Sequence, residues 1–183
     1  MKNFILCIVS LICVSGCMTI KKAVAPEKMV SKYYESVVIN DMESITVNMH
    51  PDELIKFKNM MQPVFLSLMK ESDRLAPLTF TRGESIEKIE LDTPEQFFTR
   101  FMGFYTTIQP GIKDVVQNST IETLGHVKEG DLAHVVLRMT SSLKKSEVVR
   151  LLVFSLKKDR DEWKTMLTGE VKDFARMIKR RNR

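Results

Sequence analysis

The cysteines are the most reactive side chains of this sequence, and all three lie near its start, at Cys7, Cys13 and Cys17. A short segment with one lysine opens the chain, a largely apolar stretch of eleven residues follows, and small residues come next. This order predicts a secretory signal peptide over residues 1–16. The apolar stretch would span about 16 Å as a helix, well short of a ~30 Å hydrocarbon core, so we do not expect a permanent membrane span.

The end of this segment, Val14-Ser15-Gly16-Cys17, resembles the lipobox of bacterial lipoproteins. The resemblance implies that the Cys17 thiol receives a diacylglycerol and that, after cleavage, its amino group receives a fatty acid such as palmitate. It implies a protein of the bacterial cell envelope that is anchored to a membrane by lipid. Met18 follows in place of Asp, which implies the outer membrane and a position facing the periplasm. The alternative is an ordinary signal peptide with a chance cysteine.

With Cys17 acylated, the mature chain keeps no thiol for a disulfide, a metal or a nucleophile. Histidines are the remaining metal-ligand type, and His126 and His134 flank a predicted turn. A two-residue loop at 129–130 would place them on opposite faces of the sheet. Two further zinc ligands would also be missing. The sequence therefore predicts no metal site and no cofactor.

Length and composition set limits on the fold. The chain has 183 residues, 44% of them hydrophobic and 28% charged, with only seven Gly and six Pro. These values exclude collagen-like, coiled-coil and disordered chains. They predict one domain that buries a core of its own. We expect this domain at residues 26–169, after a lipidated tether at 17–25.

Most of the net charge of +5 lies in the C-terminal segment. Residues 170–183 carry six basic and two acidic side chains, whereas residues 17–169 carry 21 of each. Val171, Phe174 and Ile178 recur at helical spacing, so we expect a short amphipathic helix that docks on the domain, with its charges in solvent. The alternative is contact with an anionic surface through Lys179, Arg180, Arg181 and Arg183. Export from the cytoplasm argues against nucleic acid as a partner.

The first half of the domain has helical periodicity. Pro26 is suited to the first position of a helix that runs to about residue 40, and further helices are expected over 42–49 and from residue 51. Pro63 should kink or break the third helix near Met61. A short strand could occupy 86–91. The motif Thr93-Pro94-Glu95-Gln96 predicts a capping box, and the helix that it opens should end at Gln109-Pro110-Gly111.

From residue 115 the period changes to two, and four strands are expected at 121–127, 132–140, 148–156 and 163–168. The third is apolar on both faces except at Arg150, which is typical of a central strand. Short connections imply antiparallel neighbours. Helices first and an antiparallel sheet second predict the α+β class, with the sheet curving over the helices.

Two stretches resemble NTF2-like domains of the SnoaL and ketosteroid isomerase superfamily. The first contains Tyr33-Tyr34, Asn40-Asp41 and His50-Pro51-Asp52; the second contains Gly130-Asp131 and Glu162-Trp163-Lys164. The resemblance covers most of residues 26–168. It implies a cone-shaped sheet around an apolar pocket.

The resemblance gives no catalytic residue. Asp41, His50 and Asp131 lie near the family's positions, but at element ends, where such residues usually cap helices. Catalytic residues are therefore not assigned. Aromatic side chains are expected mainly in the core, and a pocket could use Tyr34, Phe101, Tyr105 and Trp163.

We expect a non-catalytic domain that binds a small apolar ligand or an envelope protein. The alternative is a periplasmic enzyme of the same fold that acts on a small apolar molecule.

Overall fold

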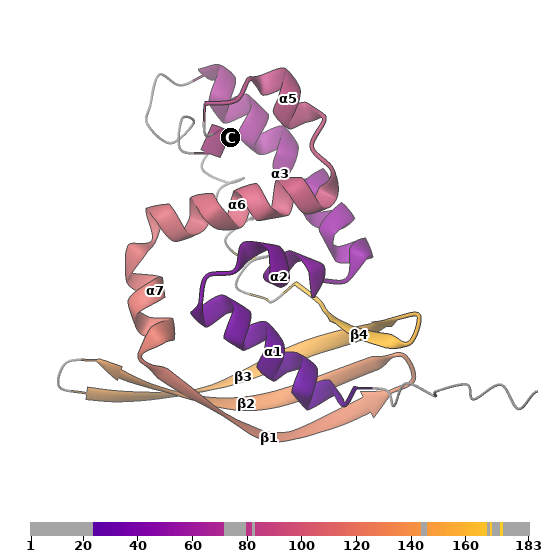
Figure 1. Cartoon of the computed structure of the whole chain (residues 1–183), viewed down its shortest axis with the longest axis vertical. Helices are drawn as coiled ribbons and strands as arrows, with labels where there is room; N and C mark the ends of the chain where they lie inside the picture. Colours follow the sequence, from indigo (N-terminus) through magenta and orange to yellow (C-terminus); the bar gives the residue numbers. More distant parts are fainter. Residues whose placement is uncertain are drawn as a thin grey trace, which may run out of the picture.

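The computed structural model describes residues 24–71, 80–81, 83–143, 146–167, 169 and 173. Helices come first in the chain and an antiparallel sheet follows (Figure 1), so the predicted α+β class is confirmed. The elements are α1 (Pro26–Val38), α2 (Met42–Val47), α3 (Pro51–Glu71), α5 (Ile86–Glu90), α6 (Pro94–Ile108), α7 (Pro110–Gln117), β1 (Ser119–Glu129), β2 (Leu132–Leu143), β3 (Ser146–Asp159) and β4 (Glu162–Thr165). The predicted signal peptide, Cys17 and residues 179–183 lie outside the described residues.

The sheet has the order β1-β2-β3-β4, and every neighbouring pair is antiparallel. The four predicted strands are therefore found, although the fourth ends at Thr165, before its predicted end at residue 168. Helix α1 covers one face of the sheet (Figure 1), where Met29 and Val30 pack against alternate residues of the strands. The buried sheet residues of this cluster are Ala133, Val135, Leu137, Phe154, Leu156 and Trp163. Burial of every second side chain is the period expected for a sheet with one covered face.

A second hydrophobic cluster lies between the helices, away from the sheet. Phe101 of α6 contacts Phe57 of α3, with ring centroids 4.7 Å apart, and Phe97 and Phe104 of α6 are buried in the same cluster. The spacing of Phe97, Phe101 and Tyr105 predicts one helix stripe, for which the sheet is the expected partner. This prediction of the partner is wrong. Helix α1 already covers the sheet, so α6 buries its aromatic stripe against α3 instead. Tyr33 of α1 packs against both clusters.

Two segments adopt a secondary structure other than the expected one. The segment expected as a strand at 86–91 instead forms helix α5 over Ile86–Glu90, because Ile86 and Ile89 place their side chains on one helical face and Ser85 caps the first turn. The Ser85 hydroxyl accepts a hydrogen bond from the Lys88 N–H at 3.4 Å. Helix α6 ends before Pro110, as predicted. Pro110 also begins α7, because the N–H groups of a first helical turn have no partner within the helix and proline lacks only that group.

Helix α3 continues through Pro63, so a break near Met61 is contradicted, whereas a kink there, the other expected effect, stays a prediction. Pro63 is exposed, whereas Phe57, Met61 and Phe65 are buried on the opposite face against the helical cluster. Packing along that face maintains the helix on both sides of the proline. The carbonyl that loses its intrahelical donor lies on the solvent side, where water can hydrate it.

Strand β3 is not central along most of its length, contrary to the expectation from its apolar sequence. Strand β2 pairs with it from residue 146 to 157, whereas β4 pairs only with residues 156–159. After β4 the chain turns away, and Leu167 is buried in the helical cluster. Within the described residues, positions 146–154 of β3 therefore have a strand neighbour on one side only.

Candidate functional site

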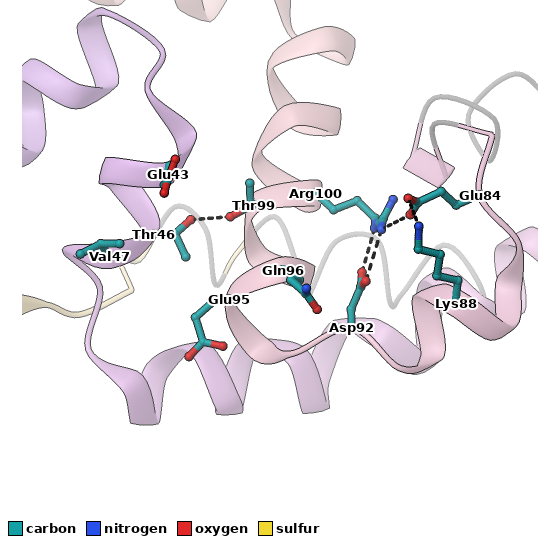
Figure 2. A pocket seen from close by; sticks show the side chains of 10 residues that line it. All are labelled: Glu43, Thr46, Val47, Glu84, Lys88, Asp92, Glu95, Gln96, Thr99 and Arg100. Atoms are coloured by element: carbon teal, nitrogen blue, oxygen red, sulfur yellow. Dashed lines mark hydrogen bonds and ion pairs between the residues drawn. The ribbon is translucent and has the colours of Figure 1, made fainter.

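An open cleft of about 510 Å³ lies where α2, α5 and α6 meet (Figure 2). All but Val47 of the described residues that line it are polar or charged. The hydroxyls of Thr46 on α2 and Thr99 on α6 lie 2.8 Å apart and join the two helices across it. The lining residues are Glu43, Thr46, Val47, Glu84, Lys88, Asp92, Glu95, Gln96, Thr99 and Arg100.

Arg100 is the centre of an ion-pair network at one end of the cleft (Figure 2). Its Nε donates to Asp92 Oδ2 at 2.8 Å, its Nη2 donates to Glu84 Oε2 at 2.5 Å, and its Nη1 donates to the Thr81 carbonyl at 3.1 Å. The side chains of Arg100 and Asp92 are only 11% and 6% exposed. The guanidinium thus fastens α6 to the preceding segment 81–92 with charge-assisted hydrogen bonds.

The protonation states in this network favour binding over proton transfer. The Lys88 and Arg100 side chains, in that order, hold the pKa of Glu84 below its ordinary value. Burial opposes the charge of Arg100, but its bonds to Asp92 and Glu84 outweigh that effect and raise its pKa. Glu84 and Arg100 therefore stay ionised near neutral pH, whereas an efficient general acid or base has a pKa close to the working pH.

The charge of the cleft selects what it could accept. Glu43 and Glu95 are exposed carboxylates at its rim, and their charges add to those of Glu84 and Asp92. Two cations, Lys88 and Arg100, oppose these four carboxylates. An anionic ligand would be repelled by this excess of negative charge.

The structure places the four predicted pocket residues in three different environments. Phe101 and Tyr105 stack on each other in the helical cluster, whereas Trp163 is buried beneath α1 in the sheet cluster. The Tyr34 hydroxyl donates to the Val116 carbonyl at 3.3 Å, which links α1 to α7. None of the four lines the cleft described above. A ligand pocket formed by these residues stays a prediction.

Hydrogen bonds within the fold involve all three residues that the resemblance to NTF2-like domains singled out, Asp41, His50 and Asp131. Asp41 caps α2, because its carboxylate accepts a hydrogen bond from the Ser44 N–H at 3.0 Å. His50 precedes α3 and its Nδ1 accepts one from the Asp52 N–H at 3.2 Å. Both therefore have the capping positions that the sequence predicted. Asp131 lies in the turn between β1 and β2, where its carbonyl accepts a hydrogen bond from the Lys158 N–H.

The two histidines of the sheet lie on opposite faces, as expected. The turn is one residue later than predicted, so that Glu129 pairs with Leu132 and His126 pairs with Val135. This shift keeps the parity of the register. His126 Nδ1 contacts the Glu27 carboxylate of α1, and His134 Nδ1 lies 3.0 Å from the Ser155 hydroxyl.

Sequence reasoning missed the Arg100 network, although a signal was present. Arg100 lies three residues after Phe97 and four before Phe104, so it occupies the same stripe of α6 as the buried phenylalanines. An arginine within a buried stripe requires a carboxylate partner. The sequence does not identify which acidic residue supplies it.

Comparisons with known proteins give no relative. No family model matches this chain, and no curated protein or solved structure is detectably similar to it. Among the helices of the described residues, none has the length and apolar character of a membrane span.

Proposed function

We propose that this protein is a lipid-anchored protein of the bacterial cell envelope. In this proposal residues 1–16 are removed as a signal peptide, Cys17 carries the lipid, and residues 17–25 tether the domain to the periplasmic face of the outer membrane. The single observation that carries the proposal is the lipobox-like motif Val14-Ser15-Gly16-Cys17, placed where the apolar stretch ends. Several acyl chains would make the attachment effectively permanent, since two already suffice.

We assign the domain over 26–169 to the NTF2-like type and give it a binding role without catalysis. The order of helices and antiparallel strands supports this assignment, because α1 lies against the covered face of the sheet. The capping bonds of Asp41 and His50 support the absence of catalysis, since both side chains already have structural roles. The ionised network around Arg100 supports it as well.

Between the two expected kinds of partner, the distribution of apolar surface favours a protein. Most of the residues that line the cleft are charged or polar, whereas large aliphatic side chains are exposed on the sheet face opposite α1. Val127 of β1 and Val149, Leu151 and Val153 of β3 are all more than half exposed. Grouped exposed apolar residues on a folded domain mark interaction surfaces.

Fatty-acid labelling tests the anchoring. We expect that cells fed a labelled palmitate incorporate it into the wild-type protein and not into a Cys17→Ser variant. Cys13→Ser is the matched control, because this cysteine lies within the predicted signal peptide and should leave labelling intact. Label retained on the Cys17→Ser protein would overturn the proposal.

A further inference from the structure

The free edge of β3 is the least protected part of the sheet. Val149, Leu151 and Val153 are 54%, 66% and 59% exposed, and no strand of the described residues pairs with them on the side away from β2. Figure 1 shows the paired ends of β2 and β3 extending beyond α1. An apolar strand with unpaired backbone groups is a template for pairing with another strand.

Two hydrogen bonds show which backbone groups point to this edge. The Ser155 carbonyl accepts from the Met166 N–H on the β4 side, at 2.8 Å. The Lys158 N–H donates to the Asp131 carbonyl on the opposite side, toward β2. Backbone direction alternates along a strand, so odd-numbered residues of β3 direct N–H and C=O away from β2. Within the described part of the chain, the free edge therefore has both exposed side chains and unpaired backbone groups at Val149, Leu151 and Val153.

The other outer strand of the sheet is protected. Strand β1 has an irregular register between Thr123 and Gly125, and charged residues, Glu122, Lys128 and Glu129, are spread along it. Bulges and charges are the usual means by which proteins prevent pairing at a sheet edge. Between residues 148 and 154, by contrast, β3 has a single charged residue, Arg150.

We propose that a second copy of this chain pairs antiparallel with β3 and extends the sheet across a two-fold axis. This inference rests on the proposed function, which favours a protein partner, and it identifies that partner as a second copy of the chain. With Leu151 opposite the same residue of the second copy, Val149 faces Val153 and Arg150 faces Leu152. The pairing ends before Ser155, because its carbonyl already accepts a hydrogen bond from the Met166 N–H. No like charges lie directly opposite each other, and aliphatic pairs stabilise such contacts.

The symmetry also agrees with a membrane anchor. A two-fold axis normal to the sheet makes the pairing isologous, with the same edge used by both copies. It leaves both α1 helices on the same side of the extended sheet. The two N-terminal tethers can therefore reach one membrane together.

Cysteine cross-linking of the full chain in isolated membranes tests the pairing. Opposed residues of a hydrogen-bonded antiparallel pair have Cα atoms about 5.5 Å apart, within reach of a disulfide. We expect Leu151→Cys to form an oxidised homodimer that reductant separates. Val127→Cys is the matched control, because Val127 is 58% exposed on β1, away from the β3 edge, and should stay monomeric.

Two further variants test the backbone contribution in detergent, with the mass of the particle as the readout. Leu151→Pro removes an N–H that faces the free edge and leaves the ladder with β2 intact. Leu151→Lys places like charges opposite each other at an exposed position. We expect either change to raise the dimer dissociation constant about tenfold or more. Unchanged circular dichroism would verify the fold, and Val127→Ser should leave the dimer intact.

Several results would overturn the inference. These are a wild-type protein that is monomeric at all concentrations, equal cross-linking through residue 127, a dimer unaffected by both Leu151 variants, and a cross-linked product that contains a different protein. Normal fatty-acid labelling of Cys17 in any of these cases would leave the anchoring proposal in place.

Discussion

Arg100 Nε lies 2.8 Å from Asp92 Oδ2, and these two side chains join the start of α6 to the segment before it. The capping box of α6, in which Thr93 and Gln96 bond reciprocally, lies between them in the sequence. The aromatic stripe of α6 is thereby held against α3. The polar network and the helical cluster lie next to each other along the same helix.

Removal of the Arg100 side chain should destabilise the domain strongly. Arg100→Ala leaves the Asp92 carboxylate buried without its cation, a change that costs about 3 kcal/mol or more. Chemical denaturation of the variant measures the loss. Arg138→Ala is the control, because its ion pair with Glu122 is exposed and should contribute at most ~1 kcal/mol. Equal effects of the two changes would contradict the buried role of Arg100.

The Phe101 ring should be one of the largest single contributions to stability. It is 1% exposed and packs against Phe57 and Phe65 of α3. Phe101→Ala should lower the free energy of unfolding by roughly 3–5 kcal/mol through lost burial and a residual cavity. Leu91→Ala, at a residue 83% exposed, should change it little. A Phe101→Ala protein that melts within about two degrees of wild type would refute this packing.

The Asp41 cap should make stability depend on pH in the acid range. Hydrogen bonds from Ser44 and Glu43 hold the pKa of the Asp41 carboxyl below its ordinary 3.8 in the folded state. A carboxyl with a lowered folded-state pKa stabilises the fold above its unfolded pKa, and this stabilisation is lost as pH falls through the folded pKa. Asp41→Asn keeps an acceptor but does not titrate. The stability difference between wild type and Asp41→Asn should therefore shrink below pH 3.8.

The basic C-terminal segment can be tested without the lipid. The four basic residues of interest are Lys179, Arg180, Arg181 and Arg183. If they only keep the protein in solution, two proteins that begin at residue 18, one with and one without residues 179–183, should co-sediment equally with anionic vesicles. Contact with anionic headgroups would instead give binding that the deletion removes. That binding should weaken as salt rises through ~0.15 M, where the Debye length is about 8 Å. We expect no difference between the two proteins, because the sequence predicts a C-terminal helix that docks on the domain through its apolar residues and leaves these charges in solvent.

Local features of this protein were predictable because they depend on neighbours within a few residues. The reciprocal bonds of Thr93 and Gln96, the caps at Asp41 and His50, and the four strands all follow from nearby side chains and short hydrogen bonds. The α+β class follows from their order. The motif at Val14-Ser15-Gly16-Cys17 is also local, and the anchoring that it predicts awaits the labelling experiment.

Tertiary structure decided which partners these elements take. The apolar residues of β3 indicate burial in a sheet interior, but β4 is too short to cover residues 146–154, and this leaves Leu151 at an edge. The stripe around Phe101 indicates a buried helix face without saying that α1 already occupies the sheet. Pro63 remains helical because α3 packs against α6 on its far side. The periodicity of apolar residues indicates only that one face of a helix or strand is buried. The surface that covers this face is decided by contacts between residues distant in the chain, because a sheet face that one helix covers is no longer accessible to another.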